Sequence, residues 1–236
     1  MTGSSARPRE AALREQLVAA SRALARRGLT PGKSGNISVR RDASHFIVTP
    51  TGMAYELLEP ADMVVMDLEG RWFGRRRPSS EWRFHRDIFR TRPDTNAIVH
   101  THSLNATALA CTGRGIPAFH YMVAAGGGED IRCAPYRTFG SQELSDAALT
   151  ALEGRRACLL GNHGLLALGA DLAAALDLAA ELESLAAQYR LALSMGQVQL
   201  LDSGEMARVV EKFRTYGQQD TNDPGLVFAG EKLPAD

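Results

Sequence analysis

Residues 96–102 read NAIVHTH, an apolar run that ends in two histidines. The β-branched and other apolar residues of this run are typical of a buried β-strand. Because side chains at positions i and i+2 of a strand project from the same face, His100 and His102 can reach one divalent ion. The pattern is also compatible with two unrelated polar residues at a strand end. It therefore predicts a metal site only if the chain supplies a further ligand elsewhere.

A third histidine lies in residues 161–164, which read GNHG between two more apolar runs. The glycines on either side of His163 permit a tight turn. A third imidazole on such a turn would complete a catalytic metal site and leave positions open for a substrate. A hydrogen-bonded turn histidine explains the same four residues equally well. The spacing alone therefore does not decide whether His163 is a metal ligand or a turn residue.

Three segments are rich in groups that bind anions. Residues 78–81 read PSSE at the start of an expected helix, where free N–H groups and the helix dipole favour an anion. Ser79 or Ser80 could equally be an ordinary N-cap, with Glu81 in the first turn. Residues 28–38 read GLTPGKSGNIS and suit a backbone nest for phosphate. Residues 49–52 read TPTG and could add further donors, or could equally form a plain turn.

Hydrophobic periodicity predicts alternating helices and short strands. The expected helices span residues 10–27, 80–90, 103–111, 141–152, 171–194 and 205–213. The expected strands span residues 36–40, 45–48, 63–67, 96–102, 118–122, 131–134, 158–161 and 165–168. This order predicts one α/β domain over residues 1–216, with a central, mostly antiparallel sheet packed between helices. Residues 217–236 are expected to form a polar, mobile tail.

Composition narrows the class of protein. The 236 residues include 44% hydrophobic and 23% charged residues, with 27 basic and 27 acidic side chains. A net charge of zero argues against a partner that is nucleic acid or a membrane surface. Three distant cysteines without a CxxC spacing, and no apolar stretch of spanning length, favour the cytoplasm. The three lysines, none within an apolar run, offer no candidate for a Schiff base.

Eight short motifs occur along the chain, and their combined order is more specific for a protein family than any single motif. They are GNIS, TPTG, PSSEWRFH, HTH, HYM, APYRTFG, NHGLL and EKFRTYG, and they extend from about Gly28 to Tyr216. Together they strongly resemble the class II aldolase/adducin family, and within it the aldolases that act on L-fuculose 1-phosphate. The resemblance favours the functional interpretation of the local patterns over the structural one.

The resemblance implies roles for particular residues. It implies a Zn²⁺ ion held by His100, His102 and His163, with Glu81 as a ligand or as the catalytic base. It implies Tyr121, reaching from a neighbouring subunit, as the acid for the aldehyde oxygen, and Tyr216 as a residue that closes over the site. The implied phosphate pocket consists of Lys33, Asn36, Thr51, Gly52, Ser79 and Ser80. Lys33 departs from the Thr or Ser expected at its position, so its role is open.

The implied activity is that of a class II aldehyde-lyase. Such an enzyme reversibly cleaves a sugar phosphate, L-fuculose 1-phosphate above all, to dihydroxyacetone phosphate and lactaldehyde. Aldolases of 5-deoxyribulose or 5-methylthioribulose 1-phosphate share the same motifs. A ribulose-5-phosphate 4-epimerase typically has Asp after the paired serines, where this chain has Glu81. A decarboxylase or dehydratase of the family, and a non-catalytic adducin-like scaffold, are the remaining alternatives. The family pattern also implies a cyclic homotetramer with sites at subunit interfaces.

Overall fold

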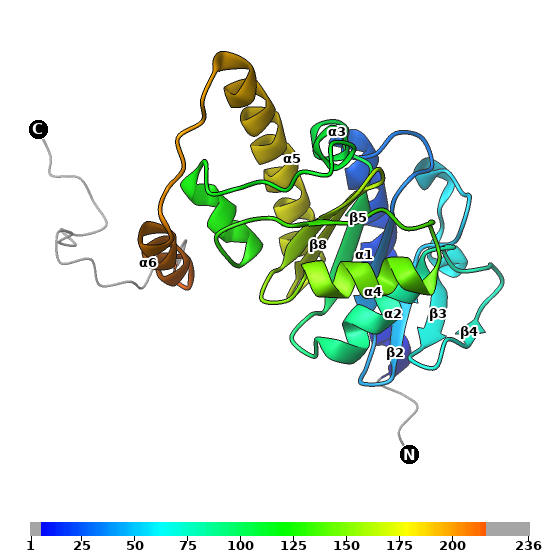
Figure 1. The fold of residues 1–236 in the computed structure, drawn as a ribbon. Helices are drawn as coiled ribbons and strands as arrows, with labels where there is room; N and C mark the ends of the chain where they lie inside the picture. Colours follow the sequence, from blue (N-terminus) through cyan, green and yellow to red (C-terminus); the bar gives the residue numbers. More distant parts are fainter. Residues whose placement is uncertain (1–5, 216–236) are drawn as a thin grey trace, which may run out of the picture.

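An eight-stranded sheet forms the centre of the computed structural model, which describes residues 6–215, with side chains from residue 9 (Figure 1). The strand order is β4-β3-β2-β1-β5-β8-β7-β6. The strands are β1 (Asn36–Arg40), β2 (His45–Val48), β3 (Val64–Asp67), β4 (Trp72–Phe73), β5 (Ala97–Thr101), β6 (Cys133–Ala134), β7 (Ala157–Leu160) and β8 (Gly164–Gly169). All neighbours pair antiparallel except β6 and β7, so the prediction of a mostly antiparallel sheet is confirmed.

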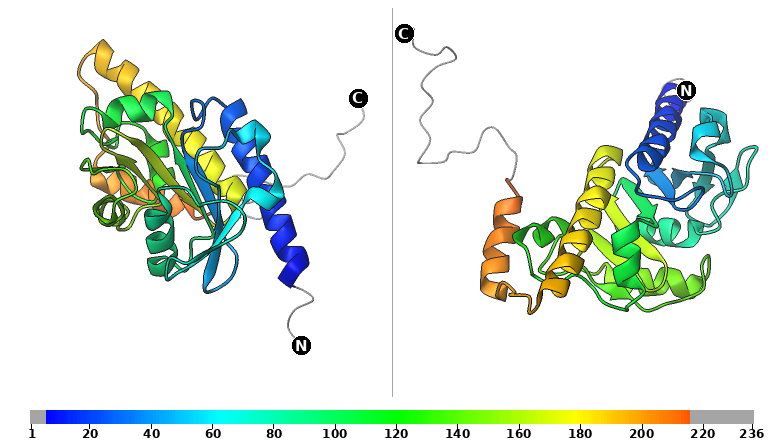
Figure 2. Two further views of the ribbon diagram at one scale, coloured as in Figure 1. Left: turned by 90° about the vertical axis from the view of Figure 1, so that its right-hand side faces the viewer. Right: turned by 90° about the horizontal axis from the view of Figure 1, so that it is seen from above.

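Helices cover both faces of the sheet (Figures 1 and 2). One face packs against α1 (Ala6–Arg26), α3 (Leu104–Ala110) and α5 (Leu172–Met195). The other face packs against α2 (Trp82–Thr91) and α4 (Gln142–Ala151). Three 3-10 helices, η1 (Tyr55–Leu57), η2 (Pro60–Asp62) and η3 (Tyr121–Gly126), lie in the connections, and α6 (Ser203–Phe213) packs beside η3. None of the helices described is long and apolar enough to cross a membrane.

Successive side chains of β5 point to opposite faces of the sheet and therefore belong to two separate hydrophobic clusters. Ala97 and Val99 belong to the hydrophobic cluster beneath α1 and α5, whereas Ile98 belongs to the cluster beneath α2 and α4. All three side chains are fully buried, and burying a side chain of Ile or Val size contributes about 1.5–3 kcal/mol. Since His100 is two residues beyond Ile98, it projects on the α2 side of the sheet.

One expected strand is absent, and one observed strand was not expected. Residues 118–122 do not form a strand, because His120 accepts a hydrogen bond from the Met122 backbone N–H and caps η3. Such local side-chain bonds compete with a strand ladder. The short edge strand β4 was not expected, since it consists of two exposed aromatic residues, Trp72 and Phe73, which pair with β3. The expected tail over residues 217–236, like Tyr216, lies outside the described residues.

Candidate active site

Glu81, His100, His102 and His163 converge at one end of the sheet, as the sequence predicted. One potential ligand atom from each lies within 4.8 Å of the others. The Nε2 atoms of His100 and His102 are 3.0 Å apart. The Glu81 Oε2 atom is 3.2 Å from His100 Nε2, and its Oε1 atom is 3.1 Å from His163 Nε2. Residues that are up to 82 positions apart in the chain therefore share one small space.

The register of the sheet brings the histidines together. His100 lies directly opposite Leu166 of β8, which places the beginning of β8 beside the end of β5. The turn between β7 and β8 carries His163, and its Asn162 adopts a left-handed φ of 54°. A Cβ atom on Gly164 would lie only 2.2 Å from the Thr101 carbonyl oxygen. Glycine at this position therefore permits the close approach that sets His163 next to His102.

Glu81 lies at the N-cap position of α2, so the alternative that Ser79 or Ser80 is an ordinary N-cap does not hold. The Glu81 carboxylate makes no capping bond to the helix. Instead, the Ser79 hydroxyl oxygen accepts a hydrogen bond from the Glu81 backbone N–H at 3.2 Å. The carboxylate faces the imidazoles and leaves the helix end uncapped, which typically costs about 0.5–2 kcal/mol. That arrangement is typical of a residue retained for a site rather than for stability.

The chemistry of these four side chains fits a divalent cation. The His100 Nδ1–H donates to the Leu165 carbonyl oxygen at 2.9 Å, so its Nε2 lone pair faces His102. Two imidazole nitrogens at 3.0 Å repel each other unless a proton or a cation lies between them. In addition, the buried Glu81 Oε1 atom has no hydrogen-bond partner among the described residues. Three imidazole nitrogens and one carboxylate are ligands that zinc prefers.

Electrostatics keep these groups in the forms that bind a metal ion. Burial raises the pKa of Glu81, but the facing imidazoles of His100 and His163 outweigh this effect and hold the pKa well below its usual range. Burial, followed by the neighbouring charges of His100 and His163, lowers the pKa of His102 to about 4. At neutral pH the carboxylate is therefore ionised and the His102 imidazole is neutral.

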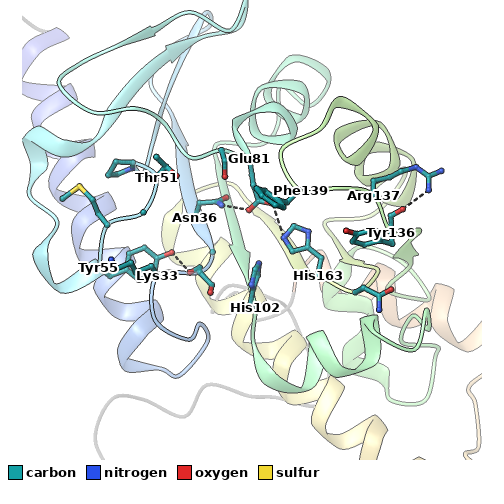
Figure 3. A pocket seen from close by; sticks show the side chains of 17 residues that line it. Lys33, Asn36, Thr51, Tyr55, Glu81, His102, Tyr136, Arg137, Phe139 and His163 are labelled. Atoms are coloured by element: carbon teal, nitrogen blue, oxygen red, sulfur yellow. Dashed lines mark hydrogen bonds and ion pairs between the residues drawn. The ribbon is translucent and has the colours of Figure 1, made fainter.

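A cavity of about 340 Å³ opens beside the Glu/His cluster. Glu81 and His163 point toward each other in it, with Lys33 and Thr51 on one side and Tyr136 and Arg137 on the other (Figure 3). Five of the six predicted phosphate ligands line this cavity: Lys33, Asn36, Thr51, Gly52 and Ser80. The sixth, Ser79, is buried beside it. The sequence therefore located one wall of the cavity.

Backbone contacts between two distant segments hold this wall in place. Pro50 and Pro78 form an isolated β-bridge, and the Ser79 N–H donates to the Thr49 carbonyl oxygen at 3.0 Å. The Thr51 N–H likewise donates to the Arg77 carbonyl oxygen at 3.2 Å. These bonds bring the TPTG and PSSE motifs side by side, so that their polar groups face the same cavity.

The sequence analysis assigned no role to several residues that line the site. Tyr55 lines the cavity, and its hydroxyl donates to the Ser34 carbonyl oxygen at 2.9 Å, which supports the loop that carries Lys33. Tyr136 and Phe139, from the APYRTFG motif, also line the cavity and remain more than half exposed. The motif alone assigned them no role, because contact with the cavity depends on how residues 135–141 fold back over Ser80.

His85 is a further residue near the site to which the sequence analysis assigned no role. It is fully buried one helical turn after Glu81, and burial lowers its pKa to about 3, so the imidazole is neutral at pH 7. One ring nitrogen lies 2.5 Å from Asn36 Oδ1 and the other 2.6 Å from Ser38 Oγ. Asn36 in turn donates from Nδ2 to Glu81 Oε2 at 2.9 Å.

Of the two predicted tyrosines the structure describes Tyr121, which does not line the cavity beside the Glu/His cluster. Tyr121 begins η3, is 47% exposed and lines a separate cavity of about 740 Å³ against α6. It is absent from the lining of the cavity that contains Glu81. Tyr216 lies outside the described residues.

Comparison with known proteins identifies the family. The model of the Class II Aldolase and Adducin N-terminal domain matches residues 15–190. A 5-methylthioribulose-1-phosphate/5-deoxyribulose-1-phosphate aldolase of Rhodospirillum rubrum is 53% identical over 206 residues, covering 87% of this chain and 93% of that protein. An L-fuculose phosphate aldolase of Escherichia coli is 45% identical, covering 87% and 95%.

Solved structures agree with this assignment. A structure of L-fuculose 1-phosphate aldolase superposes with a TM-score of 0.83 at 41% identity, covering 86% of this chain and 96% of that one. The residues matched by the family model, 15–190, include the sheet and the segments that carry the Glu/His cluster. The chain therefore belongs to the class II aldolase and adducin family, and within that family to the aldolases.

Proposed function

We propose that the protein is a zinc-dependent aldolase that reversibly cleaves a ketose 1-phosphate to dihydroxyacetone phosphate and an aldehyde. The observation that carries the proposal is the convergence of Glu81 with three imidazoles beside a cavity with one polar wall. An orphaned carboxylate oxygen in that cluster supports both a cation and a proton-transfer role. The sugar phosphate is a small-molecule partner, and the cytoplasm is the expected compartment.

Zinc held by His100, His102 and His163, with Glu81 next to it, would act as a Lewis acid that acidifies the carbon next to the substrate's carbonyl. In the condensation direction, the Glu81 carboxylate accepts the proton from the hydroxyl-bearing carbon of dihydroxyacetone phosphate. In cleavage, the bond between C3 and C4 breaks, its electron pair remains on C3, and Glu81 returns the proton there. The depressed pKa of Glu81 keeps its carboxylate ionised at neutral pH, which is the form that can accept a proton.

The polar wall of the cavity orients the substrate in this proposal. Lys33, Thr51, Gly52 and Ser80 supply an ammonium, hydroxyls and backbone N–H groups to the phosphate. One N–H of the Asn36 amide is committed to Glu81, and the second is available to a ligand. The aldehyde half then lies toward Tyr136 and Phe139, whose aromatic rings offer apolar contact.

The relatives point to two candidate substrate specificities. We rank 5-deoxyribulose and 5-methylthioribulose 1-phosphate first, because a relative named for both is 53% identical, against 45% for a fuculose phosphate aldolase over the same number of residues. The exposed rings of Tyr136 and Phe139 fit the apolar end that the aldehyde half carries in all of these substrates, so they do not separate them. L-fuculose 1-phosphate, which the sequence resemblance placed first, becomes the second candidate, supported by the structural match.

Tyr121 and Tyr216 complete the proposal. Tyr121 is exposed and does not line the cavity that contains Glu81 in its own chain, which supports a role in the site of a neighbouring subunit of a homotetramer. There its hydroxyl would exchange a proton with the aldehyde oxygen. Tyr216 retains its proposed role of closing over the bound substrate.

The metal site yields the first prediction. We expect the full-length protein to bind about one Zn²⁺ per chain in a competition titration with a chelating dye. His163→Ala should weaken binding by more than about 100-fold, since losing even an outer-shell partner of a metal ligand costs about 10–100-fold. The control is His45→Ala, because His45 is a surface residue that pairs with Asp42. Unchanged zinc affinity in His163→Ala would remove His163 from the site.

The substrate is tested by release of dihydroxyacetone phosphate, coupled to NADH oxidation. The panel contains the 1-phosphates of 5-deoxyribulose, 5-methylthioribulose, L-fuculose and L-rhamnulose, with chelated and zinc-restored enzyme. We expect the first two to have the highest kcat/KM, and chelation to abolish cleavage reversibly. Cleavage of none of them by the zinc-loaded protein, together with epimerisation of ribulose 5-phosphate, would overturn the aldolase proposal.

The proposed contact between Lys33 and the substrate phosphate gives a further prediction. Lys33→Ala should raise KM by about three- to tenfold with kcat nearly unchanged, because a partly solvated ammonium contributes only modestly to phosphate binding. The difference from wild type should shrink at high ionic strength, since salt screens exposed charges. Lys33→Arg, which retains the charge, is the matched control. An unchanged KM in Lys33→Ala at low salt would place this ammonium in solvent.

The subunit interface is tested by complementation. Tyr121→Phe and Glu81→Gln should each be nearly inactive alone. Coexpressed in equal amounts, they should recover about a quarter of the wild-type activity, because one site in four in a mixed cyclic ring combines an intact Glu81 with a neighbour's intact Tyr121. Wild-type and Glu81→Gln chains mixed in the same way are the control. No recovery in assembled hybrids would show that Tyr121 does not act across an interface.

A further inference from the structure

Ser38, His85 and Asn36 form a buried chain of hydrogen bonds that ends on Glu81. Ser38 and Asn36 are two residues apart on β1 and project on the face that α2 covers. The contacts run from Ser38 Oγ to His85 Nδ1 at 2.6 Å, from His85 Nε2 to Asn36 Oδ1 at 2.5 Å, and from Asn36 Nδ2 to Glu81 Oε2 at 2.9 Å. Each of the four residues is less than 7% exposed.

The direction of every bond in this chain follows from the chemistry of its ends. The ionised Glu81 carboxylate only accepts, so the Asn36 amide must present its NH₂ group to it. The Asn36 carbonyl oxygen then faces His85 Nε2 and needs a donor. A neutral imidazole has one donor and one acceptor nitrogen. Nε2 therefore carries the hydrogen, and Nδ1 accepts from the Ser38 hydroxyl.

Without this chain, the Asn36 amide could rotate by half a turn. It would then direct its carbonyl oxygen at Glu81 Oε2, and two acceptors would face each other in a buried site, which is unfavourable. With the chain in place, Asn36 engages Oε2, and Oε1 is left without a hydrogen-bond partner, 3.1 Å from His163 Nε2 (Figure 3). The chain thus decides which carboxylate oxygen remains available.

We propose that His85 is a positioning residue: through Asn36 it fixes the orientation of the Glu81 carboxylate, so that Oε1 faces His163. His85 is not among the residues that line the cavity or form the Glu/His group, and its hydrogen-bond route to Glu81 passes through Asn36. A polar side chain at this fully buried position is costly unless both ring nitrogens are paired, and here both are. The kinetic part of this inference rests on the proposed aldolase function, whereas its structural part does not.

The main experiment compares three variants of the full-length protein. His85→Leu fills a similar volume without a donor. His85→Gln can place an amide N–H near the position of Nε2, and His45→Gln is the matched surface control. We expect His85→Leu to lower kcat by about 10–100-fold, the usual cost of losing an outer-shell partner, with KM changed by less than about threefold. His85→Gln should remain within a few-fold of wild type, as should the control.

A second readout does not depend on turnover. Binding of Co²⁺ alone, followed by its visible absorption, should weaken by about tenfold or more in His85→Leu and stay near wild type in His85→Gln. If folded His85→Leu keeps both the wild-type kcat and the wild-type Co²⁺ affinity, the inference is wrong. It is also wrong if His85→Gln is as impaired as His85→Leu, because the effect would then not come from the N–H donor.

The hydrogen-bond directions can be measured in the unsubstituted protein, so the inference remains testable even if His85→Leu fails to fold. Long-range ¹H–¹⁵N correlation of histidine-labelled protein should show His85 as the neutral tautomer with hydrogen on Nε2. Ser38→Ala, which removes the donor to Nδ1 far from the cavity, should shift that nitrogen's resonance. Hydrogen on Nδ1 of His85 would reverse the chain and overturn the inference. Absence of aldolase activity with the expected tautomer would refute only the proposed function.

Discussion

The buried Glu/His cluster constrains the surrounding structure, because its groups repel one another unless a positive charge lies between them. Two imidazole nitrogens 3.0 Å apart and a carboxylate oxygen without a hydrogen-bond partner are unfavourable together unless a cation, or protons in its place, lies among them. The surrounding structure holds them there nonetheless: the sheet supplies the histidines rigidly, and α2 leaves its end uncapped so that Glu81 can face them. Stability is given up locally to keep a site ready for its ligand.

Each layer of the fold contributes one requirement of this site. The antiparallel register of β5 with β8 sets His100 beside the turn that carries His163. The pairing of β1 with β5 sets Asn36 opposite His100, within reach of Glu81. The contact between the Pro50 and Pro78 segments brings the anion-binding groups to the same cavity. The site therefore depends on contacts between strands and segments that are far apart in the chain. For this reason its residues meet at one end of the sheet and do not come from a single motif.

The sequence predicted most elements because their patterns are local. The strands β1 and β2 have the expected bounds, and α4 and α5 begin one residue after the expected starts at Ser141 and Asp171, which are their N-caps. Prediction was wrong where a short-range contact outweighed propensity, as when His120 caps η3 in place of a strand. The edge strand β4 was missed because two exposed residues leave no hydrophobic alternation to detect.

By itself, the sequence determined which side chains could carry the chemistry, since residue types, spacing and motif order are properties of the chain. It also determined the family, because eight ordered motifs rarely coincide. Only the tertiary structure decided that Glu81 faces the histidines instead of capping α2, that Tyr136 and Phe139 line the cavity, and that His85 orients Asn36. The physical reason is that burial, hydrogen-bond direction and distance between remote segments arise from packing, which no local pattern encodes.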